Sequence, residues 1–413
     1  MARLNIHLFS IIVAGVSLLQ HLPLTKQAKL STGYPKTSLN FMEATAQNQY
    51  TSEEHTVVTE DGYVLTIFRI TKGKNCHHPK KQRPVLLMHG LLQNSDSFLD
   101  AGPSAGLAYL LSDACYDVWV GNERGNNYAR RHITLNPDKD ADFWQFSVDE
   151  IGLYDVPALI DYILQLTRAD RLNYIGFSQG CSTYFLMCSE RPDYCKKTVM
   201  MIALAPAVTF DHTESKLFKL LCNYALYFEE SLEVLGMHEF LSLGSFKQKA
   251  MEHLCQFTGW TFTEMVCGSA VLLDNYTPGA ITSDTLRRFF SHFPAGTSLM
   301  NLVRYGQAIN SGKFQKFDYG EKVNLEKYNS TQPPEYNLNA VSTPVVILQG
   351  KKDLLISIED TKVLSRRLPN VLEFVEVPDP KWSHLDMIYN REIKKLVYPK
   401  IIEYLEKYSD STP

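Results

Sequence analysis

The chain has 413 residues, of which 45% are hydrophobic and 21% are charged. This length and composition indicate a folded globular protein with a large hydrophobic core. The formal net charge of −4 excludes the basic footprint of a nucleic-acid-binding protein, so no nucleic-acid partner is expected.

The N-terminal residues have the pattern of a secretory signal peptide. A basic start, MARLNIH, precedes an apolar run, LFSIIVAGVSLL, that ends at Leu19. A membrane span needs about 20 apolar residues, so we expect no integral span once a signal of approximately residues 1–22 is removed. An uncleaved amphipathic anchor is the alternative. Sequons at Asn275 and Asn329 agree with the secretory pathway, and we expect a secreted or lysosomal protein.

Strand and helix signals follow from residue 55 onward. The segment HTVVTEDGYVLTIFRI predicts a β-hairpin that turns at Glu60, Asp61 and Gly62. A helix is predicted over residues 149–167. Further apolar strand runs are RPVLLMHG, YDVWVGN, LNYIG, TVMMIALAP, TPVVILQG and LEFVEVP. Continuous apolar strands that alternate with helices predict an α/β fold, with a mostly parallel sheet covered by helices on both faces.

One segment breaks this alternation. Between about residues 206 and 334 the chain has amphipathic helical stretches, SKLFKLLCNYALYF and TLRRFFSHF, and aromatic loops, but no strand–helix rhythm. We therefore predict a core in two parts, residues 40–205 and 335–410, with a helical insertion over residues 206–334. Misread core elements are the alternative.

A Gly-x-Ser-x-Gly motif joins the predicted strand LNYIG to a predicted helix, CSTYFLMCSE. The motif places Ser178 between Gly176 and Gly180. In a nucleophile elbow the serine occupies a strained position at a sharp strand-to-helix turn, and its neighbours must be small because the chain crosses close to itself. An ordinary serine in a turn would match the same loose pattern. The hypothesis of a nucleophile therefore depends on a base, an acid and an oxyanion hole elsewhere in the chain.

An acid and a base follow in the order that the hydrolase arrangement requires. Asp353 lies just past the strand run VVILQG, and His384 lies past LEFVEVP. Both are expected at the carboxyl ends of strands, the same edge of the sheet as Ser178. Asp360 and Asp386 are less suitable acids, since the first falls on a predicted helix and the second is too close to His384 in sequence.

The oxyanion hole requires backbone N–H groups that point to where the tetrahedral oxygen forms. One is expected from Gln179, the residue after the nucleophile, and the other from the loop after the first core strand, LLMHGLLQNS. We predict Leu91 as the second donor. His89 is interpreted as structural.

The eight cysteines carry no metal-binding signature. The sequence contains neither Cys-x-x-Cys nor His-Glu-x-x-His, so no metal ligands are expected. Cys181, Cys188 and Cys195 are spaced by seven, which on one helix separates Cα atoms by about 10 Å, too far for a disulfide. They are predicted to be separate buried core residues. Cys255 and Cys267 are close enough in sequence for a disulfide across a short loop.

Longer stretches resemble the acid lipase family of gastric, lysosomal and insect lipases, in order from about residue 40 to about residue 400. They are TEDGYVL, HGLLQNSDSF, DVWVGNERGNNYARRH, FWQFSVDEIGLYDVPALIDYI, IGFSQG, SHFPAGTS, GKFQKFDYG, GKKDLL and SHLDMIY. The resemblance implies an α/β-hydrolase core with a cap and a lid, hydrolysis of long-chain fatty acid esters, and no cofactor. The family's nucleophile, acid and base fall on Ser178, Asp353 and His384, and its oxyanion donors fall on Leu91 and Gln179.

Two positions depart from the family pattern. The family usually has histidine before the nucleophile, where this chain has Phe177. The family's cap disulfide implies a bond from Cys255 to a position that here is Phe246, so this bond is lost or moved to Cys267.

The predicted function is a lipase that acts on a lipid ester at a lipid–water interface through an acyl-enzyme on Ser178. A carboxylesterase for smaller soluble esters would use the same triad and stays open. A catalytically silent lipid-binding protein on the same scaffold would be expected to lack a triad member. An epoxide hydrolase would have aspartate at position 178.

Overall fold

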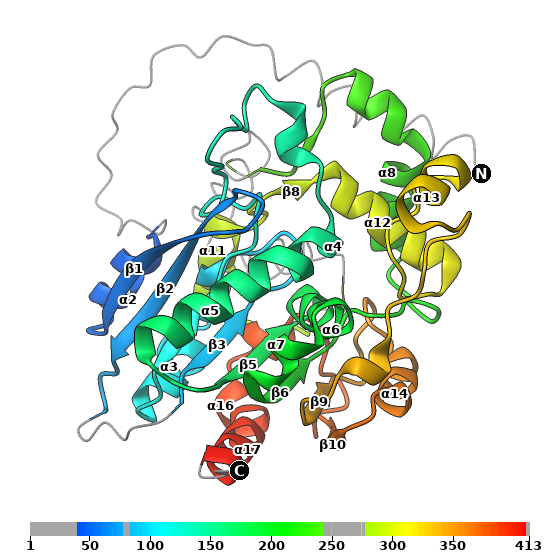
Figure 1. Ribbon diagram of the computed structural model, residues 1–413. Helices are drawn as coiled ribbons and strands as arrows, with labels where there is room; N and C mark the ends of the chain where they lie inside the picture. The colour runs from blue at the N-terminus through cyan, green and yellow to red at the C-terminus, as the bar shows by residue number, and fades with distance from the viewer. Residues whose placement is uncertain (1–38, 77–82, 243–248, 250–273, 275–276, 410–413) are drawn as a thin grey trace. The chain divides into compact units, whose positions relative to one another are not determined.

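The computed structural model describes residues 39–76, 83–242, 249, 274 and 277–409 (Figure 1). Several sequence predictions lie outside these ranges. They are the signal peptide at 1–22, the sequon at Asn275, the candidate bond between Cys255 and Cys267, and Phe246.

Eight strands of the described chain form one mixed sheet in the order β1-β2-β4-β3-β5-β6-β9-β10. β1 and β2 form the predicted hairpin and pair antiparallel, β2 also pairs antiparallel with β4, and all other neighbours are parallel. The strands are β1 (Thr51–Val58), β2 (Val64–Lys72), β3 (Val85–Met88), β4 (Val118–Val120), β5 (Leu172–Phe177), β6 (Thr198–Leu204), β9 (Val345–Gln349) and β10 (Val371–Glu376). The predicted mostly parallel sheet is confirmed.

The central strands are mainly apolar because both faces of the sheet are covered. Along β3, Val85 and Leu87 belong to one hydrophobic cluster, whereas Leu86 and Met88 belong to another. Side chains alternate across a strand, so a strand buried on both faces is apolar at most of its positions. The first cluster includes residues of α3 (Leu107–Asp113), α15 (Asp386–Tyr389), α16 (Ile393–Leu396) and α17 (Tyr398–Ser409). The second includes residues of α5 (Val156–Thr167), α6 (Gln179–Glu190), α7 (Pro192–Lys196) and α14 (Ile358–Arg367).

The helix predicted over residues 149–167 is continuous but not uniform. It begins as α4 (Val148–Glu150), passes through a π-helical segment η3 (Ile151–Asp155), and continues as α5. The remaining short elements of the core are α2 (Phe41–Gln47), η1 (Ser95–Phe98), η2 (Ala141–Trp144) and η4 (Leu338–Ala340).

The described chain between β6 and β9 is mainly helical. It contains α8 (Lys216–Val234), α11 (Ser283–His292), α12 (Leu299–Ser311), α13 (Glu321–Tyr328), and a two-residue pair of strands, β7 (Glu239–Phe240) and β8 (Thr297–Ser298). α8 and α12 share a hydrophobic cluster that includes Phe218, Cys222, Leu302 and Val303. None of the helices in the described ranges combines the length and the hydrophobicity needed to cross a bilayer.

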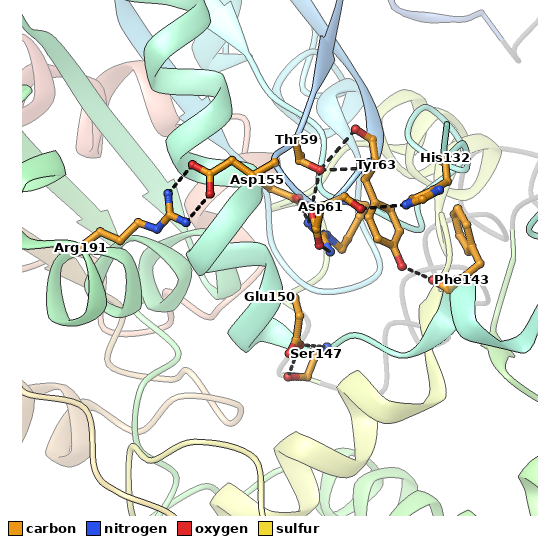
Figure 2. A network of polar contacts seen from close by, with 11 residues as sticks. Thr59, Asp61, Tyr63, His132, Phe143, Ser147, Glu150, Asp155 and Arg191 are labelled. Atoms are coloured by element: carbon orange, nitrogen blue, oxygen red, sulfur yellow. Dashed lines mark hydrogen bonds and ion pairs between the residues drawn. The ribbon is translucent and has the colours of Figure 1, made fainter. Parts of the chain in front are cut away.

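A buried arginine ties the hairpin to the loop that follows β4. Arg124 donates from its two terminal nitrogens to Asp61 at 2.6 and 2.9 Å, and from Nε to Asp155 at 2.8 Å. Its guanidinium lies 3.9 Å from the centre of the Tyr63 ring. Figure 2 shows the converging Asp61, Tyr63 and Asp155 side chains. A buried charge requires such pairing, so this network fixes the loop that also carries Glu123.

The prediction that Cys188 and Cys195 are separate core residues is wrong, because they form a disulfide with a Cα–Cα distance of 5.3 Å. The spacing argument assumed one helix, but α6 ends at Glu190 and α7 begins at Pro192, so the chain turns between the two cysteines. A second disulfide, Cys76–Cys115, was not predicted. Cys181 is free and buried, as expected.

The two disulfides are expected to differ in their effect on stability. Chain-entropy arguments give about 4 kcal/mol for the 39-residue separation of Cys76 and Cys115, and about 2 kcal/mol for the seven-residue separation of Cys188 and Cys195. Replacing both cysteines of a pair by serine should therefore lower the free energy of unfolding, measured by urea denaturation, more for Cys76–Cys115 than for Cys188–Cys195. Non-reducing peptide mapping first establishes both bonds. The opposite order would contradict the prediction.

Candidate active site

The backbone reverses sharply at Ser178, between β5 and α6. Ser178 has φ 52° and ψ −114°, and its N–H donates to the Leu204 carbonyl at 2.9 Å. A Cβ atom at Gly176 would lie 2.6 Å from the Gly180 carbonyl oxygen, and one at Gly180 would lie 2.4 Å from the Met88 carbonyl oxygen. These distances show why small residues flank the serine: the chain crosses itself and the neighbouring β3 too closely for side chains.

Asp353 lies in the loop after β9 and is a buried, fully satisfied carboxylate. One oxygen accepts the N–H groups of Leu355 at 3.0 Å and Ile356 at 2.7 Å. The other accepts from Gln349 Nε2 at 3.0 Å and lies 2.7 Å from His384 Nδ1. These four contacts satisfy the carboxylate oxygens and orient the group toward the imidazole.

His384 lies in the loop after β10 and is 3% exposed. Burial alone would lower its pKa, but the charge and the hydrogen bond of Asp353, together with the charge of Asp274, raise the pKa above its usual 6.5. Because Nδ1 contacts Asp353, the proton of the neutral ring is held there and Nε2 is left as the basic nitrogen. Ser178 and His384 line the same cavity.

Asp274 is a site residue that the sequence did not predict. It is 6% exposed, and its two carboxylate oxygens accept the N–H groups of Leu354 at 3.1 Å and Leu385 at 3.2 Å. These are the residues that directly follow Asp353 and His384. One carboxylate therefore connects the two loops. These two contacts are to backbone groups, which leave no side-chain pattern in a sequence, so they gave no signal there.

The other acids that were considered do not contact His384. Asp360 lies on α14 and pairs with His212 at 2.8 Å, and Asp386 accepts from Ser383 at the start of α15. Asn329 is exposed at the C-terminal end of α13. In the described ranges, His, Cys, Asp and Glu side chains do not gather in the groups of three that a metal site would need.

Two backbone N–H groups near Ser178 have no hydrogen-bond partner among the described residues. One belongs to Leu91 in the loop after β3, and the other belongs to Gln179, the first residue of α6. The neighbouring Gly90 N–H is occupied, because it donates to the Gln93 side chain at 2.9 Å. The first N–H groups of a helix lack internal partners, which makes this position a donor site for a negatively charged oxygen.

His89, in the same loop, has a structural environment. Its Nδ1 lies 2.9 Å from the Gly90 carbonyl, and its Nε2 accepts the Glu123 N–H at 3.2 Å. Burial lowers the pKa of His89 to about 4, so the ring is neutral at physiological pH and supports the loop geometry.

The cavity at Ser178 has about 890 Å³ of unfilled space, part of it open to solvent. Its walls are mainly aliphatic and aromatic and come from both the core and the helices between β6 and β9. They include Leu92, Phe210, Phe218, Phe289 and Leu302. Phe177, where the family pattern has histidine, also lines the cavity, and its ring lies 4.9 Å from that of His384. Few of the lining residues are polar, and these include Ser178 and His384, as in a site for an apolar ligand.

Known families and proteins match nearly the whole described chain. A family model for a partial α/β-hydrolase lipase region matches residues 41–102, and a model for the α/β-hydrolase fold matches residues 83–387. The chain is 38% identical over 372 residues to Lipase 1 of Drosophila melanogaster, covering 89% of this chain and 80% of that protein.

Two mammalian proteins are similarly close. Gastric triacylglycerol lipase of Homo sapiens is 36% identical over 384 residues, covering 92% of this chain and 94% of that protein. Lysosomal acid lipase/cholesteryl ester hydrolase of Macaca fascicularis is 34% identical over 383 residues, again with 92% and 94% covered. With this identity over nearly full length, the chain belongs to the acid lipase family of α/β-hydrolases and is a serine ester hydrolase.

Proposed function

We propose that this protein hydrolyses carboxylic esters of long-chain fatty acids, triacylglycerol or cholesteryl ester, with Ser178, His384 and Asp353 as its catalytic triad. The observation that carries the proposal is the apolar cavity into which Ser178 and His384 both open. The names of the gastric and lysosomal relatives support the same substrate class. The buried pairing of Asp353 with His384 at 2.7 Å favours an active enzyme over a silent lipid-binding protein.

The reaction runs through an acyl-enzyme. His384 Nε2 removes the proton of the Ser178 hydroxyl while Oγ attacks the ester carbonyl, and the carbonyl π electrons move to the oxygen. The tetrahedral intermediate collapses, the C–O bond to the alcohol breaks, and His384 donates its proton to the leaving alkoxide. Water then repeats the sequence on the acyl-enzyme, releases the fatty acid and restores Ser178.

Two groups stabilise the charges that form. The imidazolium is stabilised by Asp353, whose carboxylate is positioned by its contacts with Gln349, Leu355, Ile356 and His384. The Leu91 and Gln179 N–H groups hold the oxyanion. Removing one donor of this kind costs on the order of 3 kcal/mol in the transition state.

The segment over residues 206–334 acts in this proposal as a cap that completes the acyl cavity. Its helices supply Phe218 on α8, Phe289 on α11 and Leu302 on α12 to the cavity wall. The protein is synthesised with a signal peptide, is secreted or lysosomal, and meets its substrate at a lipid–water interface. Asn329 is a glycosylation site in this proposal, and its exposure at the end of α13 makes it accessible to the modifying enzyme.

Ser178→Ala should abolish hydrolysis of a long-chain triacylglycerol emulsion and of cholesteryl ester. A loss of at least about 10³-fold in kcat is expected, because the nucleophile is gone while the binding cavity is unchanged. Ser365→Ala, which removes a hydroxyl on α14 that bonds to the Lys362 carbonyl, is the matched control and should keep wild-type activity.

Each of the other possible outcomes would support a different interpretation of this protein. Activity that survives in Ser178→Ala would place the nucleophile elsewhere. Wild-type activity confined to a soluble short-chain ester would establish the carboxylesterase. Retained lipid binding without hydrolysis of any ester would establish the silent binding protein.

Asp274→Asn should move the acidic limb of the kcat/KM profile to lower pH. The base must be neutral, so kcat/KM rises with pH through the pKa of His384. The negative charge of Asp274 helps to raise that pKa, and its removal lowers the pKa. The measurement is kcat/KM against pH on a soluble ester. Asp360→Asn, the same change at a buried acid that pairs with His212, should leave the limb in place. An unmoved limb in Asp274→Asn would contradict the prediction.

A further inference from the structure

The side chain of Gln179 is held at both ends of its amide. Its Nε2 donates to Glu123 Oε2, and its Oε1 accepts from Asn301 Nδ2 at 3.1 Å and from the Tyr305 hydroxyl at 2.9 Å. All four residues are buried. With both lone pairs of the oxygen used and the nitrogen engaged, the amide has a single favourable orientation.

The partners come from two separate parts of the chain. Glu123 lies in the loop after β4, beside Arg124, which the Asp61 and Asp155 carboxylates fix. Asn301 and Tyr305 lie four residues apart on one face of α12. Gln179 is therefore held by the core on one side and by a helix of the 206–334 segment on the other.

The start of α12 is itself anchored. Ser298 caps the helix by accepting the Asn301 N–H at 3.0 Å, and its hydroxyl donates to the Phe146 carbonyl of the core. Asn301 is thus positioned by both its backbone and its side chain. A shift of α12 would move both of its contacts to Gln179 together.

Tyr305 connects the cavity wall to Gln179. Its side chain lines the cavity at Ser178, and its hydroxyl contacts Gln179. Leu302, on the same helix, also lines the cavity. The wall that a bound acyl chain contacts is therefore one hydrogen bond away from the residue whose N–H points to the reacting carbonyl.

We propose that Tyr305 and Asn301 are positioning residues that, through the Gln179 side chain, aim its backbone N–H at the oxyanion and couple the acyl-cavity wall to that donor. This inference rests on the proposed function, in which Gln179 is an oxyanion donor. It predicts a kinetic signature. An oxyanion donor acts mainly in the transition state, so a misaligned donor lowers kcat and leaves KM unchanged.

The opposing interpretation is that these contacts only satisfy buried polar groups. Burial raises the pKa of Glu123 well above its usual range, with a smaller contribution from the charge of Asp155 and against the lowering by the Gln179 bond. A network of this kind stabilises the fold in any case. A purely stabilising role would lower the free energy of unfolding or the fraction of active enzyme, but not kcat per active site.

Tyr305→Phe is the direct test, because it removes the hydroxyl and keeps the ring in the cavity wall. On a soluble ester, with active sites titrated, kcat should fall by about 10-fold, less than the 10²–10³-fold loss of a whole donor, with KM within about twofold. Affinity for a phosphonate or boronate transition-state analogue should fall by the same factor. Tyr184→Phe is the matched control: it removes a buried hydroxyl on α6, the helix that begins at Gln179, where it bonds to Thr343 at 2.7 Å, and it should not change kcat.

A double-mutant cycle tests the route through Gln179. Gln179→Met keeps the backbone N–H and loses the amide, so Tyr305→Phe should have no further effect on kcat in that background. Independent, multiplicative losses would overturn the proposal, as would a Tyr305→Phe kcat within about twofold of wild type. If Tyr305→Phe does not fold, Asn301→Ala is expected to show the same kcat loss, and its absence is equally decisive.

Ser178→Ala is run beside these variants to separate the two claims. One outcome is that Ser178→Ala abolishes hydrolysis while Tyr305→Phe leaves kcat unchanged. This would overturn the inference and leave the proposed function standing. If the wild-type protein shows no hydrolysis that depends on Ser178, both the inference and the proposed function are overturned.

Discussion

The strained backbone at Ser178 is the constraint on which the rest of the site depends. A non-glycine residue at φ 52° and ψ −114° costs on the order of 1–3 kcal/mol and persists only where its surroundings hold it. Here β5 fixes one side, α6 fixes the other, and the Leu204 carbonyl accepts the serine N–H. The strain leaves the serine side chain facing the cavity and the Gln179 N–H in the first turn of α6, where it has no partner within the helix. The proposed nucleophile and one proposed oxyanion donor are thus placed by a single turn.

The proposed acid, Asp353, and the proposed base, His384, depend on a different principle, the cost of burying charge. A buried carboxylate is costly unless its oxygens have hydrogen-bond partners, and Asp353 has four, including Nδ1 of His384. Asp274 holds the two loops together, because its oxygens accept N–H groups from the residues after Asp353 and after His384. The charges that tune the imidazole are therefore the same groups that hold it in place.

The sequence was sufficient for the sheet, because continuous apolar runs have few alternatives to strands buried on both faces. It was also sufficient to predict that Ser178, Asp353 and His384 lie at one edge of the sheet, because the carboxyl ends of parallel strands meet there. It failed where the tertiary path decided the outcome. The Cys188–Cys195 disulfide requires the break before Pro192, and spacing counted along one helix could not show it. The hydrogen bonds from Asn301 and Tyr305 to Gln179 join residues more than 100 positions apart, and only the folded chain reveals this pairing.

The replacement of histidine by Phe177 has a consequence for how the site titrates. The Phe177 ring packs against His384 at 4.9 Å and is 1% exposed. A histidine at this position would place a second ionisable ring against the base, and two interacting groups share their protons in steps that belong to neither alone. Phenylalanine removes that coupling and adds an apolar surface that lowers the local polarity. His89 does not take up the role, because burial holds its pKa near 4. The pKa of His384 is thereby set by burial, which lowers it, and by Asp353 and Asp274, which raise it.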